Sequence, residues 1–459
     1  MCFGSGCASS GGSDWHTVLV MPEGPGGNSP FALDITKVID ETNGLQMNNL
    51  KLLWSAPTTS DSTTWDKSLG ETTSVPSFYF AGYLSSGSAD NRVLFASGYP
   101  TKSGTSYADQ GLWILNVNAE SGAVVGNESK DISTLTVDDK CTDTRPNQTR
   151  TLIADVALAR DYSSAATSQN LMAAYVGDTW GNTFQYVPTA STKLSKLYSL
   201  GCGQPLYFAP AVVQLDRAPK ADTSAKKYIY LVQVTNSNRD PLTEPYAADL
   251  YPGSQLVVTK LNGNVSPPVA VTSYNLLSPD GSGRIVLSTD STTPSNRICI
   301  QSDNSTSFTG TNNTKTATQS CSDAGSVALP SAARPIGTPT ITLRSDGLGF
   351  QVIASWYDPT VRDNNCSSGS QFNYGKSYIT VHEFGADGAV YQIAGLTLNS
   401  TVLTGVTFVG TSLYINGINT SSTPQSLSFG ETFSKMQDVL NNAGADRYVR
   451  TTWTERVDL

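Results

Sequence analysis

Apolar and polar residues alternate with a period of two along much of this chain. The alternation is clear in "HTVLVMP" (16–22), "NRVLFASGYP" (91–100) and "GLWILNVNAESGAVV" (111–125). Such short alternating runs, bounded by Gly, Pro, Asn and Asp, are typical of half-buried β-strands. The pattern therefore predicts an all-β chain built from antiparallel hairpins.

Turn dipeptides between these strands support the hairpins. Asn262-Gly263 in "QLVVTKLNGNVSP" and Asp346-Gly347 in "TITLRSDGLGFQVIASW" tolerate the positive φ angles that a tight hairpin turn needs. A further turn is expected at 385–388. The hairpins recur at uneven spacing, so the sequence defines no repeat period.

One segment has the spacing of a helix rather than a strand. In "GETFSKMQDVLNNAG" (430–444) the apolar residues share one helical face: Phe433, Met436, Val439 and Leu440. Gly444 is available as the C-cap. The sequence thus predicts one short helix near the C-terminus.

Many hairpins in a chain of 459 residues suit either an array of sandwiches or a β-propeller. A propeller leaves few exposed strand edges, and it can grow by adding sheets around a ring. Stretches rich in Ser, Thr and Asn at 58–74, 290–296 and 302–326 are expected to be long loop insertions between strands.

The amino-acid composition excludes some classes of binding partner. The net charge is −9, only 15% of residues are charged, and Lys and Arg form no cluster. Nucleic-acid binding requires many cations on one face, so we expect no nucleic-acid partner. No apolar run approaches the roughly 20 residues of a membrane span, and we expect none.

The chain has seven cysteines: Cys2, Cys7, Cys141, Cys202, Cys299, Cys321 and Cys366. None forms a C-x-x-C pair, so the spacing does not indicate zinc. Sparse cysteines in Ser/Thr-rich loops favour disulfides of an oxidising compartment. Our preferred pairs are Cys299–Cys321 and Cys2–Cys7, with Cys366 left over. Buried reduced thiols remain the alternative.

The stretch "YVGDTWGNTFQYVP" (175–188) has the most distinctive chemistry. Its marked residues are Tyr175, Gly177, Asp178, Gly181 and Asn182. We interpret it as the corner of a sheet, where the Asp and Asn side chains cap backbone N–H groups and Gly supplies positive φ. A polar ligand site is the alternative, and we prefer the corner because Asx–Gly turns are mostly structural.

A catalytic site is hard to assemble from this sequence. The two histidines, His16 and His382, are far apart in sequence and each lies inside a strand pattern. No Gly-x-Ser-x-Gly elbow is present. We assign no catalytic residue and no cofactor, and we predict that the protein is not an enzyme.

Several short segments follow one another in a distinctive order along the chain. They are "DWHTVLVMPEGPGGNSPFALDIT" (14–36), "LLWSA…SLGETTSVPSF" (52–78), "VLFASGYP", "GLWILNVNAESGAVV", "AAYVGDTWGNTFQYVP", "CGQPLYFAPAVV" and the terminal "RTTWTE". In this order they resemble the C-terminal region of PilY/PilC-type type IV pilus proteins. The resemblance covers most of 14–215 and the C-terminus, and it is weak over about 216–430.

This resemblance implies a modified β-propeller, related in shape to quinoprotein dehydrogenases. It implies an exported protein at the pilus tip or cell surface, seated on the minor pilins and contacting a host or abiotic surface. The implied roles are control of pilus assembly and retraction, surface adhesion and twitching motility.

The sequence departs from the family pattern in two places. Family members usually have an Asp-rich calcium loop before the Tyr-x-Gly-Asp block, but here only Asp155, Asp161 and Asn170 remain, without the spacing calcium needs. A von Willebrand-type domain and an earlier blade usually precede this region, and neither fits within residues 1–14. We expect 1–14 to be a linker remnant and 15–459 to be the propeller, as a C-terminal portion of such a protein or an unusual member.

Two other functions remain open. A quinoprotein-type (PQQ-dependent) oxidoreductase would use the same fold, with a quinone stacked on a Trp and beside a cation, but the vicinal Cys-Cys pair of such enzymes is absent here. A secreted carbohydrate-binding lectin differs from the pilus protein in its partner alone.

The C-terminal segment "RYVRTTWTERVDL" (447–459) has the pattern of a strand, with Tyr448, Val449 and Trp453 among polar residues. A strand at a chain end needs a sheet edge to satisfy its backbone groups. We expect it to close the propeller on the first blade. The alternative is that it adds to an exposed sheet of a minor pilin.

Overall fold

The computed structural model describes the strands and their nearest connections. The described residues are Met1, 15–24, 27, 29–40, 42–55, 57, 69–83, 89–99, 113–125, 130–132, 135, 150–160, 171–200, 204–215, 228–235, 254–263, 268–275, 285–287, 333–343, 349–359, 375–385, 390–399, 401–409 and 412–419.

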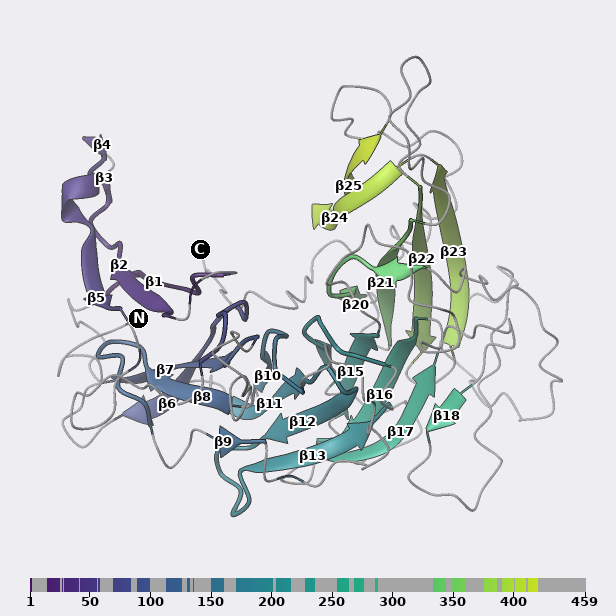
Figure 1. Ribbon diagram of the computed structural model, residues 1–459, viewed down its shortest axis with the longest axis horizontal. Coiled ribbons are helices and arrows are strands. Elements are labelled where there is room, and N and C mark those ends of the chain that lie inside the picture. Colours follow the sequence, from purple (N-terminus) through teal and green to yellow (C-terminus); the bar gives the residue numbers. More distant parts are fainter. Residues whose placement is uncertain are drawn as a thin grey trace, which may run out of the picture. The chain divides into compact units, whose positions relative to one another are not determined.

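The chain forms two compact units. Unit 1 comprises Met1–Cys202, Tyr207–Ala209 and Thr452–Leu459, and unit 2 comprises Gly203–Leu206 and Pro210–Thr451. Each unit is built from antiparallel sheets, which we number in chain order (Figure 1).

Unit 1 holds sheets 1 to 3. Sheet 1 consists of β1 (Val18–Met21), β2 (Phe31–Asp34) and β5 (Lys51–Trp54). Between β2 and β5 lie the hairpin β3 (Ile39–Asp40)–β4 (Gly44–Leu45) and the 3-10 helix η2 (Met47–Asn49). Sheet 2 consists of β6 (Ser77–Tyr83), β7 (Ala89–Ala96), β8 (Trp113–Asn118) and β9 (Lys130–Asp131). Sheet 3 consists of β10 (Ala157–Arg160), β11 (Leu171–Gly177), β12 (Asn182–Tyr186) and β13 (Leu194–Ser199).

Unit 2 holds sheets 4 to 6. Sheet 4 consists of β14 (Ala211–Leu215), β15 (Tyr228–Val234), β16 (Leu256–Asn262), β17 (Val269–Asn275) and β18 (Ile285–Leu287). Sheet 5 consists of β19 (Arg334–Pro335), β21 (Gly349–Asp358), β22 (Lys376–Gly385) and β23 (Val390–Asn399), with β20 (Thr340–Leu343) paired to β21. Sheet 6 is the hairpin β24 (Thr401–Val409)–β25 (Ser412–Asn419).

Sheet 2 is buried on both faces because its apolar residues alternate between two cores. One face packs with sheet 1 in a core that contains Val20, Ala32, Trp54, Val93, Phe95, Leu115 and Val117. The other face packs with sheet 3 in a core that contains Leu94, Ala96, Ile114, Val176, Phe184 and Tyr186. The period of two in the sequence thus becomes a face-to-face stack of consecutive sheets.

Unit 2 repeats this arrangement of consecutive sheets. Tyr230 of β15 and Phe350 of β21 place their ring centroids 5.0 Å apart, which joins sheets 4 and 5. The backbone N–H of Leu403 in β24 donates to the Ser377 hydroxyl of β22 at 3.2 Å, which joins sheets 5 and 6.

The predicted all-β fold is confirmed. Sheets 2 and 3 each have four antiparallel strands in chain order and stack face to face, which is the construction of propeller blades. The expected insertion at 58–74 ends earlier than predicted, because Glu71 and Thr72 already form bridges to Tyr99 and Gly24.

Several predictions fall outside the described residues: the helix at 430–444, the strand at 447–459 with Tyr448 and Trp453, the insertions at 290–296 and 302–326, and all seven cysteines. Within the described part of the chain, no helix is long and apolar enough to cross a membrane.

Candidate functional site

A recurring corner joins the second and third strands of sheets 2, 3 and 4. The residue just after the second strand bonds reciprocally with the residue facing it near the start of the third: Ser97 with Trp113, Asp178 with Asn182, and Thr235 with Gln255. In these pairs the first residue's N–H donates to the facing carbonyl at 2.9, 2.9 and 3.0 Å. Its side-chain oxygen accepts the facing N–H at 2.9, 2.8 and 2.9 Å.

The Gly-Asp stretch singled out in the sequence is this corner in sheet 3. Asp178 Oδ1 accepts the N–H groups of Trp180 at 3.0 Å and Asn182 at 2.8 Å. The positive φ angle falls at Gly181, at +78°. The Asn182 amide does not cap a backbone N–H as we expected; it donates to Asp178 Oδ2 at 2.9 Å.

The first two marked residues of that stretch belong to strand β11. Tyr175 is fully buried, and its hydroxyl accepts a hydrogen bond from Gln185 Nε2 at 3.3 Å on β12. Burial, as the largest effect, raises the pKa of Tyr175. Gly177 is the last residue of β11. The stretch is therefore a strand, a tight corner and a second strand.

Arg150 completes this corner, and sequence reasoning missed it. Its Nε donates to Asp178 Oδ2 at 2.9 Å, and the Asp178 side chain is 0% exposed. The guanidinium carbon lies 5.3 Å from the centre of the Phe184 ring. Burial raises the pKa of Asp178, while the bonds from Asn182 and Arg150 oppose that rise. No spacing signal links Arg150 to Asp178, since the two lie in different connections of the chain.

Two backbone bonds and one hydroxyl bond link the corner of sheet 3 to that of sheet 2. Thr179 N–H donates to Thr151 O at 3.0 Å, and the Thr151 hydroxyl donates to Gly98 O at 2.6 Å. Gly98 N–H in turn donates to Leu152 O at 3.0 Å. The polar groups of the corner thus tie neighbouring sheets together.

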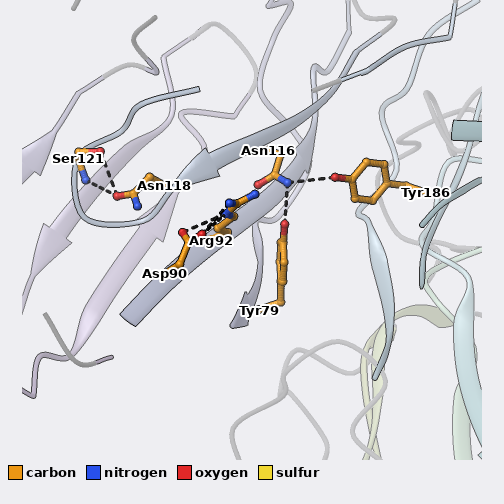
Figure 2. Close-up of polar contacts among 7 residues, drawn as sticks. All are labelled: Tyr79, Asp90, Arg92, Asn116, Asn118, Ser121 and Tyr186. Atoms are coloured by element: carbon orange, nitrogen blue, oxygen red, sulfur yellow. Dashed lines mark hydrogen bonds and ion pairs between the residues drawn. The ribbon is translucent and has the colours of Figure 1, made fainter. Parts of the chain in front are cut away.

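A second buried polar contact crosses between sheets 2 and 3 (Figure 2). Asn116 Nδ2 donates to the Tyr79 hydroxyl at 2.6 Å and lies 3.2 Å from the Tyr186 hydroxyl. These side chains come from β8, β6 and β12, and all are buried. Because buried polar groups are costly unless they are hydrogen-bonded, this contact specifies how the two sheets meet.

Two more polar contacts in Figure 2 lie on β7 and just after β8, the two inner strands of sheet 2. Arg92 pairs with Asp90 at 2.6 Å on β7. Asn118 Oδ1 accepts the N–H groups of Glu120 and Ser121 at 3.1 and 2.9 Å, which shapes the turn after β8. Both contacts are local, within four residues of the chain.

The two histidines have different surroundings and lie in different units. His16 Nδ1 is 2.7 Å from Asp34 Oδ2 across β1 and β2. Partial burial disfavours the Asp34 carboxylate, but hydrogen bonds from Thr36 and His16 outweigh it and lower the pKa of Asp34. The Thr36 hydroxyl donates to Asp34 and not to the imidazole. The three side chains of His16, Asp34 and Thr36 therefore connect the segment before β1 to the end of β2.

His382 is fully buried in β22, opposite Val352 of β21 and Gln392 of β23. Burial lowers its pKa to about 4, so the imidazole is neutral at physiological pH. The register shifts between Val381 and His382, which places a β-bulge beside this side chain.

Asp155, Asp161 and Asn170 stand where the family pattern has a calcium loop, and of these three residues the structure describes Asp155. Its Oδ1 accepts Val75 N–H at 2.6 Å, and burial raises its pKa to about 6. Asp161 and Asn170 fall outside the described residues. In the part of the chain that the structure describes, no group of three or more His, Cys, Asp or Glu side chains converges as metal ligands do.

Comparisons with known proteins add little. No family model matches the chain, and no curated protein matches it. A solved structure of core factor from S. cerevisiae aligns at 10% identity with a TM-score of 0.20, over 95% of this chain. The chain spans 65% of the length of that protein, and a TM-score this low supports no argument about fold or function.

Proposed function

We propose that this chain is a non-enzymatic type IV pilus tip protein. It acts in pilus assembly and retraction control, in surface adhesion and in twitching motility. The observation that supports the proposal is the ordered series of short segments that resemble PilY/PilC-type proteins, "DWHTVLV" to "CGQPLYFAPAVV".

These segments follow the architecture one element at a time. "HTVLVMP" and "FALDIT" contain β1 and β2, "VLFASGYP" contains the end of β7 and its corner, and "GLWILNV" contains β8. "YVGDTWGNTFQYVP" contains the end of β11, the Asp178 corner and β12, and "FAPAVV" leads into β14. A likeness that comes from Ser/Thr-rich composition alone has no reason to follow strand and corner boundaries in this way.

The polar chemistry of the corner favours a scaffold over an enzyme. Both Asp178 carboxylate oxygens accept bonds from Arg150, Trp180 and Asn182. Groups committed to such bonds hold the fold, and a substrate would have to displace them. The recurring corner is then the device that joins blades, and recognition falls to the connections between them.

The partners that this proposal implies are minor pilins beneath the protein and a host or abiotic surface above it. The implied location is outside the cell, at the pilus tip or the cell surface. The low charge of the chain, at 15% charged residues, fits a surface rich in hydroxyl and amide groups.

Reconstitution with the minor pilins of the same bacterium tests the proposal. We expect the purified chain to co-elute with the minor pilin complex and to show no dye-linked alcohol oxidation when quinone and calcium are added. Quinone-dependent oxidation would establish the oxidoreductase instead. Glycan binding without any pilin complex would establish the lectin.

A further inference from the structure

Three Asn-Gly dipeptides occur in the sequence: Asn43-Gly44, Asn262-Gly263 and Asn416-Gly417. In such a dipeptide the Asn side chain can react with the backbone nitrogen of the next residue, because glycine has no Cβ to obstruct the approach. The reaction requires a backbone that can leave its regular hydrogen-bonded geometry. The structure around each dipeptide therefore decides which of the three reacts in the folded protein.

Two of these dipeptides are held in strand ladders. Asn262 is the last residue of β16, an inner strand of sheet 4, and it pairs with one residue of β15 and one of β17. Asn416 and Gly417 both lie within β25 and pair with residues of β24. Reaction at either site has to disrupt these pairings first.

The dipeptide Asn43-Gly44 lies instead at the turn of the β3–β4 hairpin (Figure 1). Each strand of this hairpin has two residues, and among the described strands it pairs with no other sheet. Asn43 and Gly44 are both exposed, and Gly44 has a φ of +69°. Because a lone two-stranded hairpin is marginally stable, this turn opens locally at a small cost in free energy.

The side chain of Gln46 makes the Gly44 nitrogen more reactive. Its Nε2 donates to the backbone oxygen of Asn43 at 2.9 Å. That carbonyl belongs to the same peptide group as the Gly44 N–H. A hydrogen bond to its oxygen polarises the peptide group and draws electron density from the nitrogen, which makes the N–H proton easier to lose.

We propose that Asn43 is a site of deamidation and that Gln46 promotes the reaction. The Gly44 nitrogen loses its proton and attacks the side-chain carbonyl carbon of Asn43, and the side-chain nitrogen leaves with that proton as ammonia. One water molecule then opens the resulting succinimide ring at either of its two carbonyls. The products are aspartate and isoaspartate at position 43, and water is the only co-reactant.

Either product changes the hairpin. Both add a negative charge to its turn, and isoaspartate also adds one atom to the path of the backbone. Ile39 and Leu45 lie opposite each other across the hairpin and are 77% and 68% exposed. Because the turn sets the register of a hairpin, an extra backbone atom disturbs this pairing. Deamidation therefore alters the exposed apolar pair that the hairpin displays.

Peptide mapping of the full chain during incubation at mildly alkaline pH tests the site. Trypsin releases residues 38–51 as one peptide, and tandem mass spectrometry locates the converted residue within it. In the folded chain we expect Asn43 to convert about tenfold or more faster than Asn262 and Asn416, and in urea we expect the three rates to converge. Equal rates in the folded chain, or no conversion at Asn43 while the unfolded chain converts, would overturn the proposal.

Two variants separate the chemistry from the fold. Gly44→Ala places a Cβ beside the attacking nitrogen, and that Cβ meets nothing within 4 Å. Alanine at this positive φ is strained and loosens the turn, which alone would speed the reaction, so a slower rate reports the blocked attack. Gln46→Met keeps a side chain of similar length and removes the donor to the Asn43 oxygen.

We expect almost no conversion of Asn43 in Gly44→Ala and a reaction several-fold slower than the parent's in Gln46→Met. The rate at Asn262 should stay unchanged in both variants. A parental rate in Gly44→Ala would overturn the deamidation site, and a parental rate in Gln46→Met would overturn the promoting role of Gln46.

Discussion

At the scale of single residues, hydrogen bonds between buried polar groups hold the corners in place. Asp178 is fully buried beside Arg150, and its pKa is raised by burial against the pull of its partners. Removing one member of such a pair leaves the other charge buried and uncompensated. The corner is therefore a place where small changes have large effects on stability.

We predict that Asp178→Ala lowers the free energy of unfolding by about 3–5 kcal/mol, because Arg150 then remains charged without a partner. Asn118→Ala serves as the comparison, since Asn118 caps a partly exposed turn and its loss should cost about 1 kcal/mol. Urea denaturation followed by tryptophan fluorescence measures both variants. Losses of equal size would show that the buried pair has no special role.

Asp155 gives a prediction about pH. Its pKa is raised from 3.8 to about 6, so the folded state binds the proton more tightly, and stability falls as pH rises through about 6. Asp155→Asn keeps an acceptor for Val75 N–H and removes the charge. We expect the variant to be more stable than the parent above about pH 7, by up to roughly 3 kcal/mol, with no advantage near pH 4. Melting curves across this range would contradict the idea if the two proteins stayed parallel.

His382 should act in the opposite direction. Its pKa is lowered from 6.5 to about 4, so the unfolded state binds the proton more tightly and stability is lost as pH falls between these values. His382→Leu removes the titrating group from the core. We expect the parent to lose up to roughly 3 kcal/mol relative to the variant between about pH 7 and pH 4. An unchanged difference across that interval would rule out a neutral buried imidazole.

At the scale of elements, the strands could be read from the sequence but the repeat could not. Alternation located β7, β8 and β16, and Asn262-Gly263 marked the end of β16. The repeated corner could not be predicted from the sequence, because Ser97, Asp178 and Thr235 accept the facing backbone N–H with three different side chains. Connections of unequal length also separate them, so no period survives in the sequence.

Two glycines test the corner geometry as a matched pair. A Cβ at Gly98 would lie 1.9 Å from Glu71 O, whereas a Cβ at Gly24 meets nothing within 4 Å. Both have positive φ, so Gly24→Ala should cost only the backbone strain of about 1–2 kcal/mol. Gly98→Ala should cost clearly more, because the connection into sheet 2 must move. Denaturation midpoints that fall equally in both variants would contradict the close approach.

At the scale of the whole molecule, the sequence indicated the class of fold through local pattern alone. Face-to-face stacking of sheets depends on contacts between distant residues, such as Asn116 with Tyr79 and Tyr186, and these have no local signature. The same holds for Arg150, whose partner is set by the fold. The proposed function rests on the ordered segments that resemble pilus tip proteins, and several of these, from HTVLVMP to YVGDTWGNTFQYVP, contain strands or corners of the described residues.

Immunogold electron microscopy of type IV pili, on cells that express this chain, tests the proposed pilus-tip function most directly. We predict label at the distal ends of pili in wild-type cells, and loss of both label and twitching motility in cells that lack the gene, restored by the intact chain. Normal twitching in cells without the gene, with the protein found away from pili, would contradict the proposed function.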